Sequence, residues 1–141
     1  MPFTIETNPQ LATQNSSAVL LIDDNAIQAA TRQAILRRAG YSVIAVLDPA
    51  RALEQFQQHS FPSNICAVIT DHIMPGMTGA EFVRALRKTH PDLPVMVISG
   101  LEEAESEYHG LDVRFLLKPL QPDLLLANLR GLLAQQEQGA A

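Results

Sequence analysis

Five short apolar runs recur along the chain, and each leads into a segment with helical spacing. The runs cover residues 18–22, 42–47, 65–70, 94–98 and 113–117. Continuous apolar runs of this length are typical of strands that are buried on both faces, as in a parallel sheet. The alternation of strand and helix predicts an α/β domain with a doubly wound parallel sheet, right-handed crossovers and helices on both faces.

The segments between the runs carry helix signals. From Asn25 to Gly40 the residues at helical spacing are Ile27, Ala30, Thr31, Ala34 and Ile35. Asp48 is a cap residue, and Pro49 after it fits a first helical turn. Thr78 followed by Glu81 fits a capping box. The last helix opens at 121–122, and its apolar face consists of Leu125, Leu129, Leu132 and Leu133.

The segment at 101–110 differs from the others. It holds four glutamates and few apolar anchors, so we expect any helix there to be short or irregular. Residues 1–17 are polar and without a period, which indicates a mobile tail. We expect one domain at 18–134 and a fraying tail at 135–141.

Composition restricts the class of protein. The chain is 47% hydrophobic and 18% charged, as is ordinary for a globular domain. The net charge is −5 and the ten Lys and Arg residues are scattered, which argues against direct nucleic-acid binding. We find no apolar stretch near the roughly 18 residues that a membrane span needs. The single cysteine, Cys66, can form no internal disulfide, and this suits the cytoplasm.

Residues that can handle charge follow four of the five runs. They are Asp23 and Asp24 after the first, Asp71 after the third, Ser99 after the fourth and Lys118 after the fifth. The carboxyl ends of strands in a doubly wound sheet converge on one edge, where ligands bind. We therefore expect three carboxylates, a hydroxyl and an ammonium group to meet there.

This set of groups suits phosphoryl transfer. Three carboxylates in one pocket repel one another, and a hard divalent cation such as Mg²⁺ removes that repulsion. An aspartate can act as the nucleophile and form an aspartyl phosphate. A lysine and a serine hydroxyl can then contact the phosphoryl oxygens, with the charge of the transition state stabilised electrostatically.

The sequence resembles the receiver domain of two-component response regulators. The resemblance runs from about residue 19 to about residue 133 and is carried by LIDDN at 21–25, DHIMPGMTG at 71–79, SG at 99–100 and FLLKP at 115–119. It implies a CheY-like, flavodoxin-like (βα)5 fold with strand order 2-1-3-4-5. It also implies a phosphorylation-dependent signalling switch rather than a metabolic enzyme.

The resemblance assigns a role to each residue at the strand ends. Asp71 would accept a phosphoryl group from a sensor histidine kinase or a histidine phosphotransfer protein. Mg²⁺ would be ligated by Asp24, Asp71 and the backbone carbonyl of Ile73, with Asp23 acting mostly through water. Lys118 would pair with the phosphoryl oxygens. Ser99 would swing toward the phosphate, and Phe115 would rotate inward with it.

Two departures from the family pattern concern the output. Ser99 and Lys118 are 19 positions apart, a few fewer than is usual, and the shortage falls in the acidic 101–110 segment. The helix there is part of the usual output and dimer face, so the geometry of a downstream protein partner or of a homodimer stays open. The sequence shows no effector domain after residue 133, so we expect a stand-alone regulator, and a piece of a longer protein stays the open alternative.

Each of these residues also has a plainer interpretation. Asp23 and Asp24 could cap the first helix, Ser99 the fourth, and Lys118 could be a solvated loop lysine. Phe115 fits a core residue as well as a switch. We interpret His72 as a solvated loop histidine and leave it outside the catalytic set.

Two rival functions use the same fold. One is a Mg²⁺-dependent phosphohydrolase with an aspartyl phosphate. Such enzymes often have a carboxylate two residues past the nucleophile, where this chain has the apolar Ile73. The other is a receiver-like scaffold that works without phosphorylation, although a scaffold need not keep the full set of charged groups. The sequence has no Gly-rich loop after the first predicted strand, which argues against nucleotide or flavin binding.

Overall fold

The computed structural model of the protein describes the backbone of residues 17–140 and the side chains of residues 17–135. The expected N-terminal tail lies outside the described residues except for Ser17, which begins the first strand. The C-terminal boundary expected at 134 falls inside a helix that continues to Ala140.

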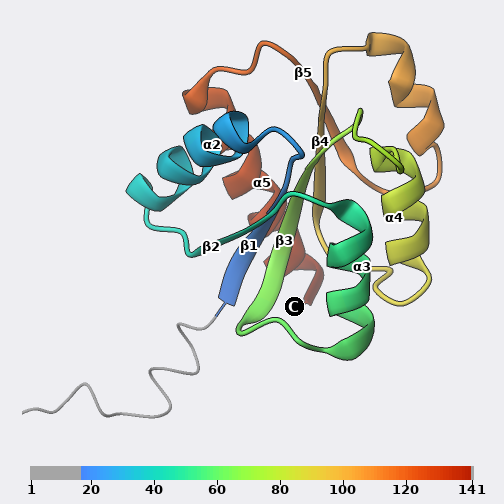
Figure 1. Ribbon diagram of the computed structural model, residues 1–141. Helices are drawn as coiled ribbons and strands as arrows, with labels where there is room; N and C mark the ends of the chain where they lie inside the picture. Colours follow the sequence, from blue (N-terminus) through green and yellow to red (C-terminus); the bar gives the residue numbers. More distant parts are fainter. Residues whose placement is uncertain (1–16, 141) are drawn as a thin grey trace, which may run out of the picture.

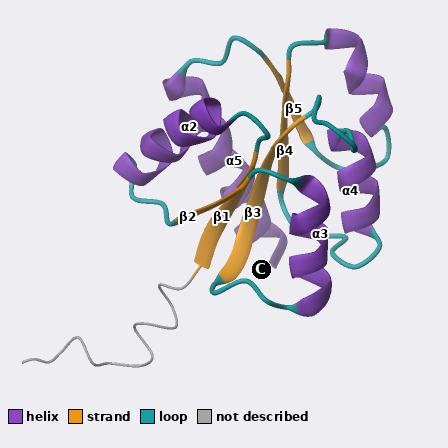
Figure 2. Cartoon of the chain, in the orientation of Figure 1, coloured by secondary structure: helices purple, strands orange, loops and turns teal. Residues whose placement is uncertain are grey.

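Five parallel strands form one sheet in the order β2-β1-β3-β4-β5, which confirms the expected fold (Figure 2). The strands are β1 (Ser17–Ile22), β2 (Val43–Val46), β3 (Asn64–Asp71), β4 (Val95–Ser99) and β5 (Arg114–Leu117). β1 lies between β2 and β3, and the centre of the sheet is β3. This order places the switch point, where neighbouring crossovers leave in opposite directions, between β1 and β3.

The register aligns the carboxyl ends of the strands along one edge of the sheet, which we call the rim. Ile22 at the end of β1 lies beside Thr70 of β3, and Ser99 at the end of β4 lies beside Leu117 of β5. The residues at this rim are Asp23, Asp24, Asp71, Ser99 and Lys118.

Helices cover both faces of the sheet (Figure 1). α2 (Ala26–Arg38) and α5 (Pro122–Ala140) lie on one face, and α3 (Pro49–Gln58) and α4 (Gly79–Arg87) lie on the other. One buried cluster joins the sheet to α2 and α5 through residues such as Leu21, Leu36 and Leu129. A second joins it to α3 and α4 through residues such as Val68 and Phe82. None of the helices within residues 17–140 has the length and apolar character to cross a membrane.

The helix starts follow the expected caps. The Asn25 side chain accepts hydrogen bonds from two backbone N–H groups of α2, and Asp48 does so from one in α3. Thr78 and Glu81 form a full capping box at α4, in which each side chain accepts from the other's backbone N–H. These caps fix where each helix leaves the rim.

The face of α2 that meets the sheet is not the one that the sequence suggested. Ile27 is 79% exposed, whereas Ala29 and Leu36 are buried. Alanines occur on several sides of this helix, so the apolar pattern does not determine which side faces inward. As a consequence Arg32, which lies on the buried side between Ala29 and Leu36, points toward the sheet rather than to solvent.

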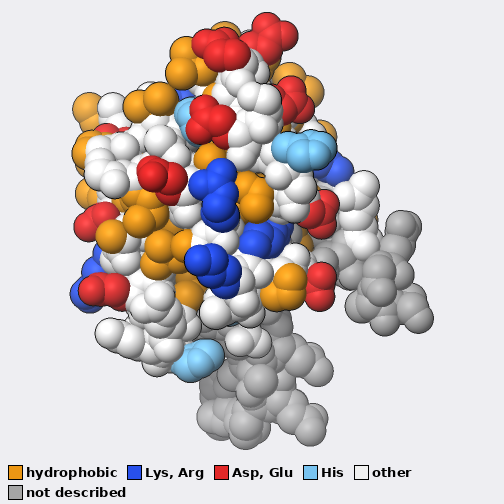
Figure 3. All heavy atoms as spheres, turned by 90° about the vertical axis from the view of Figure 1, so that its right-hand side faces the viewer, with side chains coloured by type: hydrophobic (Ala, Val, Ile, Leu, Met, Phe, Trp, Pro, Cys, Tyr) orange, Lys and Arg blue, Asp and Glu red, His pale blue; other side chains and the backbone are white. Residues whose placement is uncertain are grey.

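A 3₁₀ helix, η2 (Glu102–Tyr108), replaces a regular helix between β4 and β5. This confirms the expectation of a short or irregular fourth helix. Its four glutamates are exposed, and only Ala104 and Tyr108 are buried. Figure 3, which views the side of α4 and η2, shows acidic side chains toward its upper end and basic side chains across its middle.

Candidate functional site

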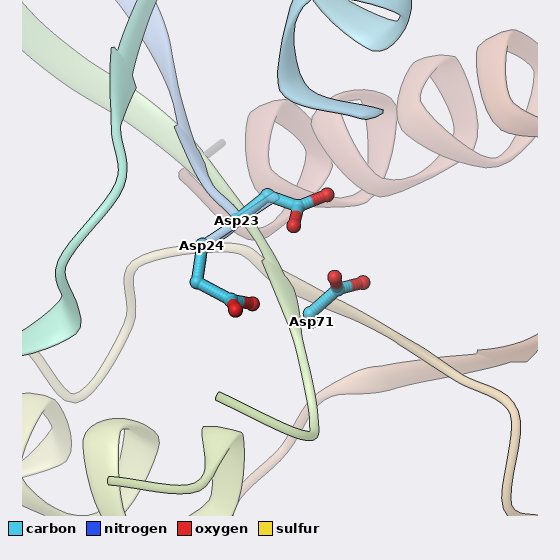
Figure 4. Close-up of side chains that lie close together, drawn as sticks. All are labelled: Asp23, Asp24 and Asp71. Atoms are coloured by element: carbon cyan, nitrogen blue, oxygen red, sulfur yellow. The ribbon is translucent and has the colours of Figure 1, made fainter. Parts of the chain in front are cut away.

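Three carboxylates converge at the rim between β1 and β3. Asp23 and Asp24 follow the end of β1 and Asp71 ends β3, and one oxygen of each lies within 4.8 Å of the other two (Figure 4). Asp23 and Asp71 are buried, while Asp24 is exposed. The three acids therefore lie together as expected, and one of them, Asp24, is open to solvent.

Two cations contact the carboxylate of Asp71. The Nζ of Lys118 lies 3.3 Å from Oδ1 of Asp71. The Nη1 of Arg32 lies 3.1 Å from the same oxygen and 2.9 Å from Oδ2 of Asp23. Lys118 is at the place that the sequence predicted, whereas Arg32 was not among the predicted site residues.

Burial, together with the neighbouring Asp71, raises the pKa of Asp23 to about 6. The backbone N–H of Asn25, which donates to Oδ1 of Asp23, and the Arg32 guanidinium act in the opposite direction. Both oxygens of Asp23 thus already have hydrogen-bond donors. The role that the resemblance gives Asp23, contact with a metal mostly through water, stays a prediction.

Ser99 is buried at the end of β4, and its hydroxyl bonds to the loop that follows. Its Oγ accepts from the backbone N–H of Leu101 at 2.9 Å and lies 3.2 Å from the carbonyl oxygen of Leu101. Ser99 thus forms a local turn just before η2 and does not cap that helix, because the N-cap position is Leu101 and no side chain caps it. A turn of the hydroxyl toward Asp71 would release the Leu101 N–H at the start of η2.

Phe115 is half-buried in β5 and packs against η2. Its ring centroid lies 5.7 Å from that of Tyr108, and the two rings are tilted. A pocket of about 310 Å³ lies beside this pair and is lined by η2 and β5. Phe115 therefore packs against the core cluster and also lines this pocket.

His72 is buried, so its interpretation as a solvated loop histidine was wrong. Its Nδ1 lies 2.6 Å from the hydroxyl of Tyr108, and its Nε2 lies 3.5 Å from a carboxylate oxygen of Glu107. The side chain of the residue after Asp71 turns toward η2 because strand residues alternate between the faces of a sheet. His72 thus links the end of β3 to η2.

The sequence alone contains no decisive signal for Arg32. Arg32 lies three residues after Ala29 and four before Leu36, positions that share one face of a helix. Only because the structure shows this face to be buried does the long charged side chain indicate a partner inside the site.

The donors at the rim fit a hard divalent cation. Carboxylate oxygens from two strand ends lie within reach of one ion, and the exposed Asp24 leaves room for the waters that Mg²⁺ keeps. Ile73, whose carbonyl the resemblance adds to the set, is 61% exposed in the loop that follows β3.

Comparisons with known proteins identify the family. A sequence profile described as the response regulator receiver domain matches residues 19–130. The chain belongs to the response regulator receiver domain family. The two-component response regulator ORR6 of rice, Oryza sativa subsp. japonica, is 33% identical over 121 residues, covering 77% of this chain and 66% of ORR6. The fold is thus that of a receiver domain.

Two other similar proteins come from bacteria. The C4-dicarboxylate transport transcriptional regulatory protein DctD of Pseudomonas aeruginosa is 40% identical over 116 residues, covering 79% of this chain and 24% of DctD. The crystal structure of the Vibrio cholerae chemotaxis protein CheY4 matches with a TM-score of 0.72 and 28% identity, covering 82% of this chain and 98% of that one. This chain spans about two thirds of the length of ORR6 and about a quarter of the length of DctD.

Proposed function

We propose that Asp71 accepts a phosphoryl group and that the receiver works as a phosphorylation-dependent switch in a two-component system. The observation that supports this most is the position of Asp71, a buried carboxylate at the end of the central strand with two cations on one of its oxygens. Both cation contacts fall on Oδ1, so Oδ2 is the oxygen that would attack phosphorus.

The donor would be the phosphohistidine of a sensor histidine kinase or of a histidine phosphotransfer protein, as receiver domains use. A new bond forms between the Asp71 oxygen and phosphorus, and the bond from phosphorus to the imidazole nitrogen breaks. Lys118 then lies where it can pair with a phosphoryl oxygen. Its ammonium stabilises the charge that the phosphoryl oxygens gain during transfer.

Asp24 and Asp71, with the carbonyl of Ile73, would hold Mg²⁺, and Asp23 would act through water. The bound ion would offset the repulsion among the carboxylates and favour negative charge on the phosphoryl oxygens. Because Asp24 is exposed, the rim would be accessible to a phosphoryl donor from solvent. The buried Asp23 would form the inner side of the site.

The rival phosphohydrolase function lacks a general base at the expected position. Ile73, two residues past Asp71, is apolar and exposed, so it cannot activate water. We therefore expect slow self-dephosphorylation and not rapid turnover, with output through a downstream protein partner.

The test uses Mg²⁺, a small acyl phosphate as donor and intact-mass measurement. Wild type should gain the mass of one phosphoryl group, and EDTA should prevent the gain. Asp71→Asn should gain none, while the control Asp92→Asn, which changes an exposed acid elsewhere, should behave as wild type. A gain on Asp71→Asn, or none on wild type, would refute the assignment. Rapid hydrolysis of a phosphoester would support the phosphohydrolase instead.

A further inference from the structure

Arg32 reaches the site from a helix that the receiver function does not otherwise use. It lies on the inner side of α2, and its side chain is only 13% exposed. Burying an arginine is costly unless the guanidinium is paired. Here one nitrogen, Nη1, contacts both Asp23 and the proposed phosphoacceptor Asp71, at 2.9 and 3.1 Å.

The position of this guanidinium changes the charge of the site. With the three carboxylates ionised and only Lys118 as cation, the rim would carry two net negative charges. Arg32 reduces this to one. A cation supplied by the protein therefore already does part of what a divalent ion does, namely reduce the repulsion between Asp23 and Asp71.

We propose that Arg32 is a tethered counter-ion that competes with the divalent cation for the carboxylates of Asp23 and Asp71. This inference rests on the proposed function, because it takes the three acids to be the metal site. Arg32 is a positioning residue in this proposal: it acts through the two aspartates and stabilises the metal-free receiver. In return, the unphosphorylated receiver binds Mg²⁺ less tightly than the same acids would without the guanidinium.

The competition has two physical sources. A like charge a few ångströms from the ion opposes binding directly, even when water screens the interaction. In addition, the oxygen of Asp71 that Arg32 contacts must be shared with the ion or released to it. Removing one unit charge from beside a divalent ion should tighten binding on the order of tenfold.

The experiment compares Mg²⁺ affinity and thermal stability in wild type, Arg32→Gln, Arg32→Lys and Arg38→Gln. Arg38 is a matched control, because it is an exposed arginine at the end of the same helix. Calorimetric titration should give Arg32→Gln a Kd for Mg²⁺ about tenfold lower than wild type. Arg38→Gln should match wild type, and Arg32→Lys should move back toward it because the charge is restored.

Thermal stability separates a counter-ion from a merely structural arginine. In EDTA, Arg32→Gln should melt below wild type, and saturating Mg²⁺ should raise its Tm more than it raises that of wild type, because tighter binding to the folded state stabilises it more. A structural role alone would lower Tm equally in EDTA and in Mg²⁺, which would overturn the proposal.

A measurement on wild type needs no variant to fold. The side-chain ¹⁵N resonances of Arg32 should shift on titration with Mg²⁺, and those of Arg38 should not. Unchanged Arg32 resonances at saturating Mg²⁺ would overturn the competition.

The outcomes also separate this proposal from the proposed function. Equal Mg²⁺ affinity in wild type and Arg32→Gln would refute the role of Arg32 and leave the receiver function intact. Absence of Mg²⁺ binding in both proteins would refute the metal site, and the role of Arg32 with it. Binding by Arg32→Gln alone would be the strongest form of support.

Discussion

Asp23 is a fully buried carboxylate whose ionisation opposes folding. Its pKa is about 6 in the folded chain, against an ordinary value of 3.8. A carboxyl group whose pKa is raised by folding favours the folded state below the ordinary value, and this contribution is lost as the pH rises through the folded value. The metal-free receiver should therefore lose stability at Asp23 between about pH 4 and pH 6.

Asp23→Asn should remove this pH dependence. In EDTA, its free energy of unfolding relative to wild type should increase by about 2 kcal/mol between pH 4 and pH 8, because only wild type has to ionise the buried group. Urea denaturation at both pH values measures the difference. Asp92→Asn, at an exposed position, should show no comparable change. A pH-independent difference for Asp23→Asn would contradict the raised pKa.

The sequence could identify the acids of the site but not every group that contacts them. Asp23, Asp71 and Lys118 follow apolar runs, and the strand ends of a parallel sheet meet, so chain order alone brings them together. Arg32 depends instead on the rotation of α2 about its axis. That rotation cannot be determined from an alanine-rich pattern. The Arg32 side chain also contacts Asp71 of β3, which is far from it in sequence.

At the scale of elements, the start of α4 packs unusually close to the end of β3. A Cβ added to Gly79 would lie 2.6 Å from the backbone oxygen of Asp71 and 2.5 Å from the hydroxyl of Tyr108. The backbone N–H of Gly79 also donates to the carbonyl of His72 at 2.7 Å. The glycine lets α4 start directly against the end of β3, so this approach fixes the loop between them.

Gly79→Ala should therefore destabilise the domain by about 1–3 kcal/mol, the usual cost of forcing an extra carbon into a packed position. The neighbouring atom is backbone, so the strand end or α4 has to shift. Gly100→Ala is the matched control, because a Cβ there would have no atom within 4 Å. Thermal or urea unfolding of both variants measures the difference. Equal stability of the two variants would show that the contact relaxes without cost.

Helices whose ends are marked by local capping residues could be predicted from the sequence. The long-range contacts that these elements make could not. Thr78 and Glu81 predict the start of α4 because their capping box depends only on residues that are close in sequence. The scarcity of apolar residues after Ser99 likewise predicts a weak helix, and η2 is a 3₁₀ helix. The burial of His72 was missed because it depends on Tyr108, which lies 36 positions further along the chain.

At the scale of the whole molecule, contacts on one side of the sheet connect the rim to η2 and β5. From Ser99 a path runs through Leu101 to η2, and from His72 another runs to Tyr108, which packs on Phe115. Both paths end at η2 and β5, beside the pocket between them. α3 ends near His59, at the opposite end of the sheet from these contacts.

This arrangement predicts where phosphorylation should be felt. If Ser99 turns its hydroxyl to the phosphoryl group, the Leu101 N–H loses its acceptor, and the first turn of η2 loosens. Amide chemical shifts should then change at the rim, along η2 and in β5, and remain constant in the second half of α3. Asp71→Asn, treated with the same donor and Mg²⁺, is the control.

Changes confined to the rim would show that the effect of phosphorylation does not reach η2. Changes extending into α3 would show that the response follows the whole sheet and not the contacts of Ser99 and His72.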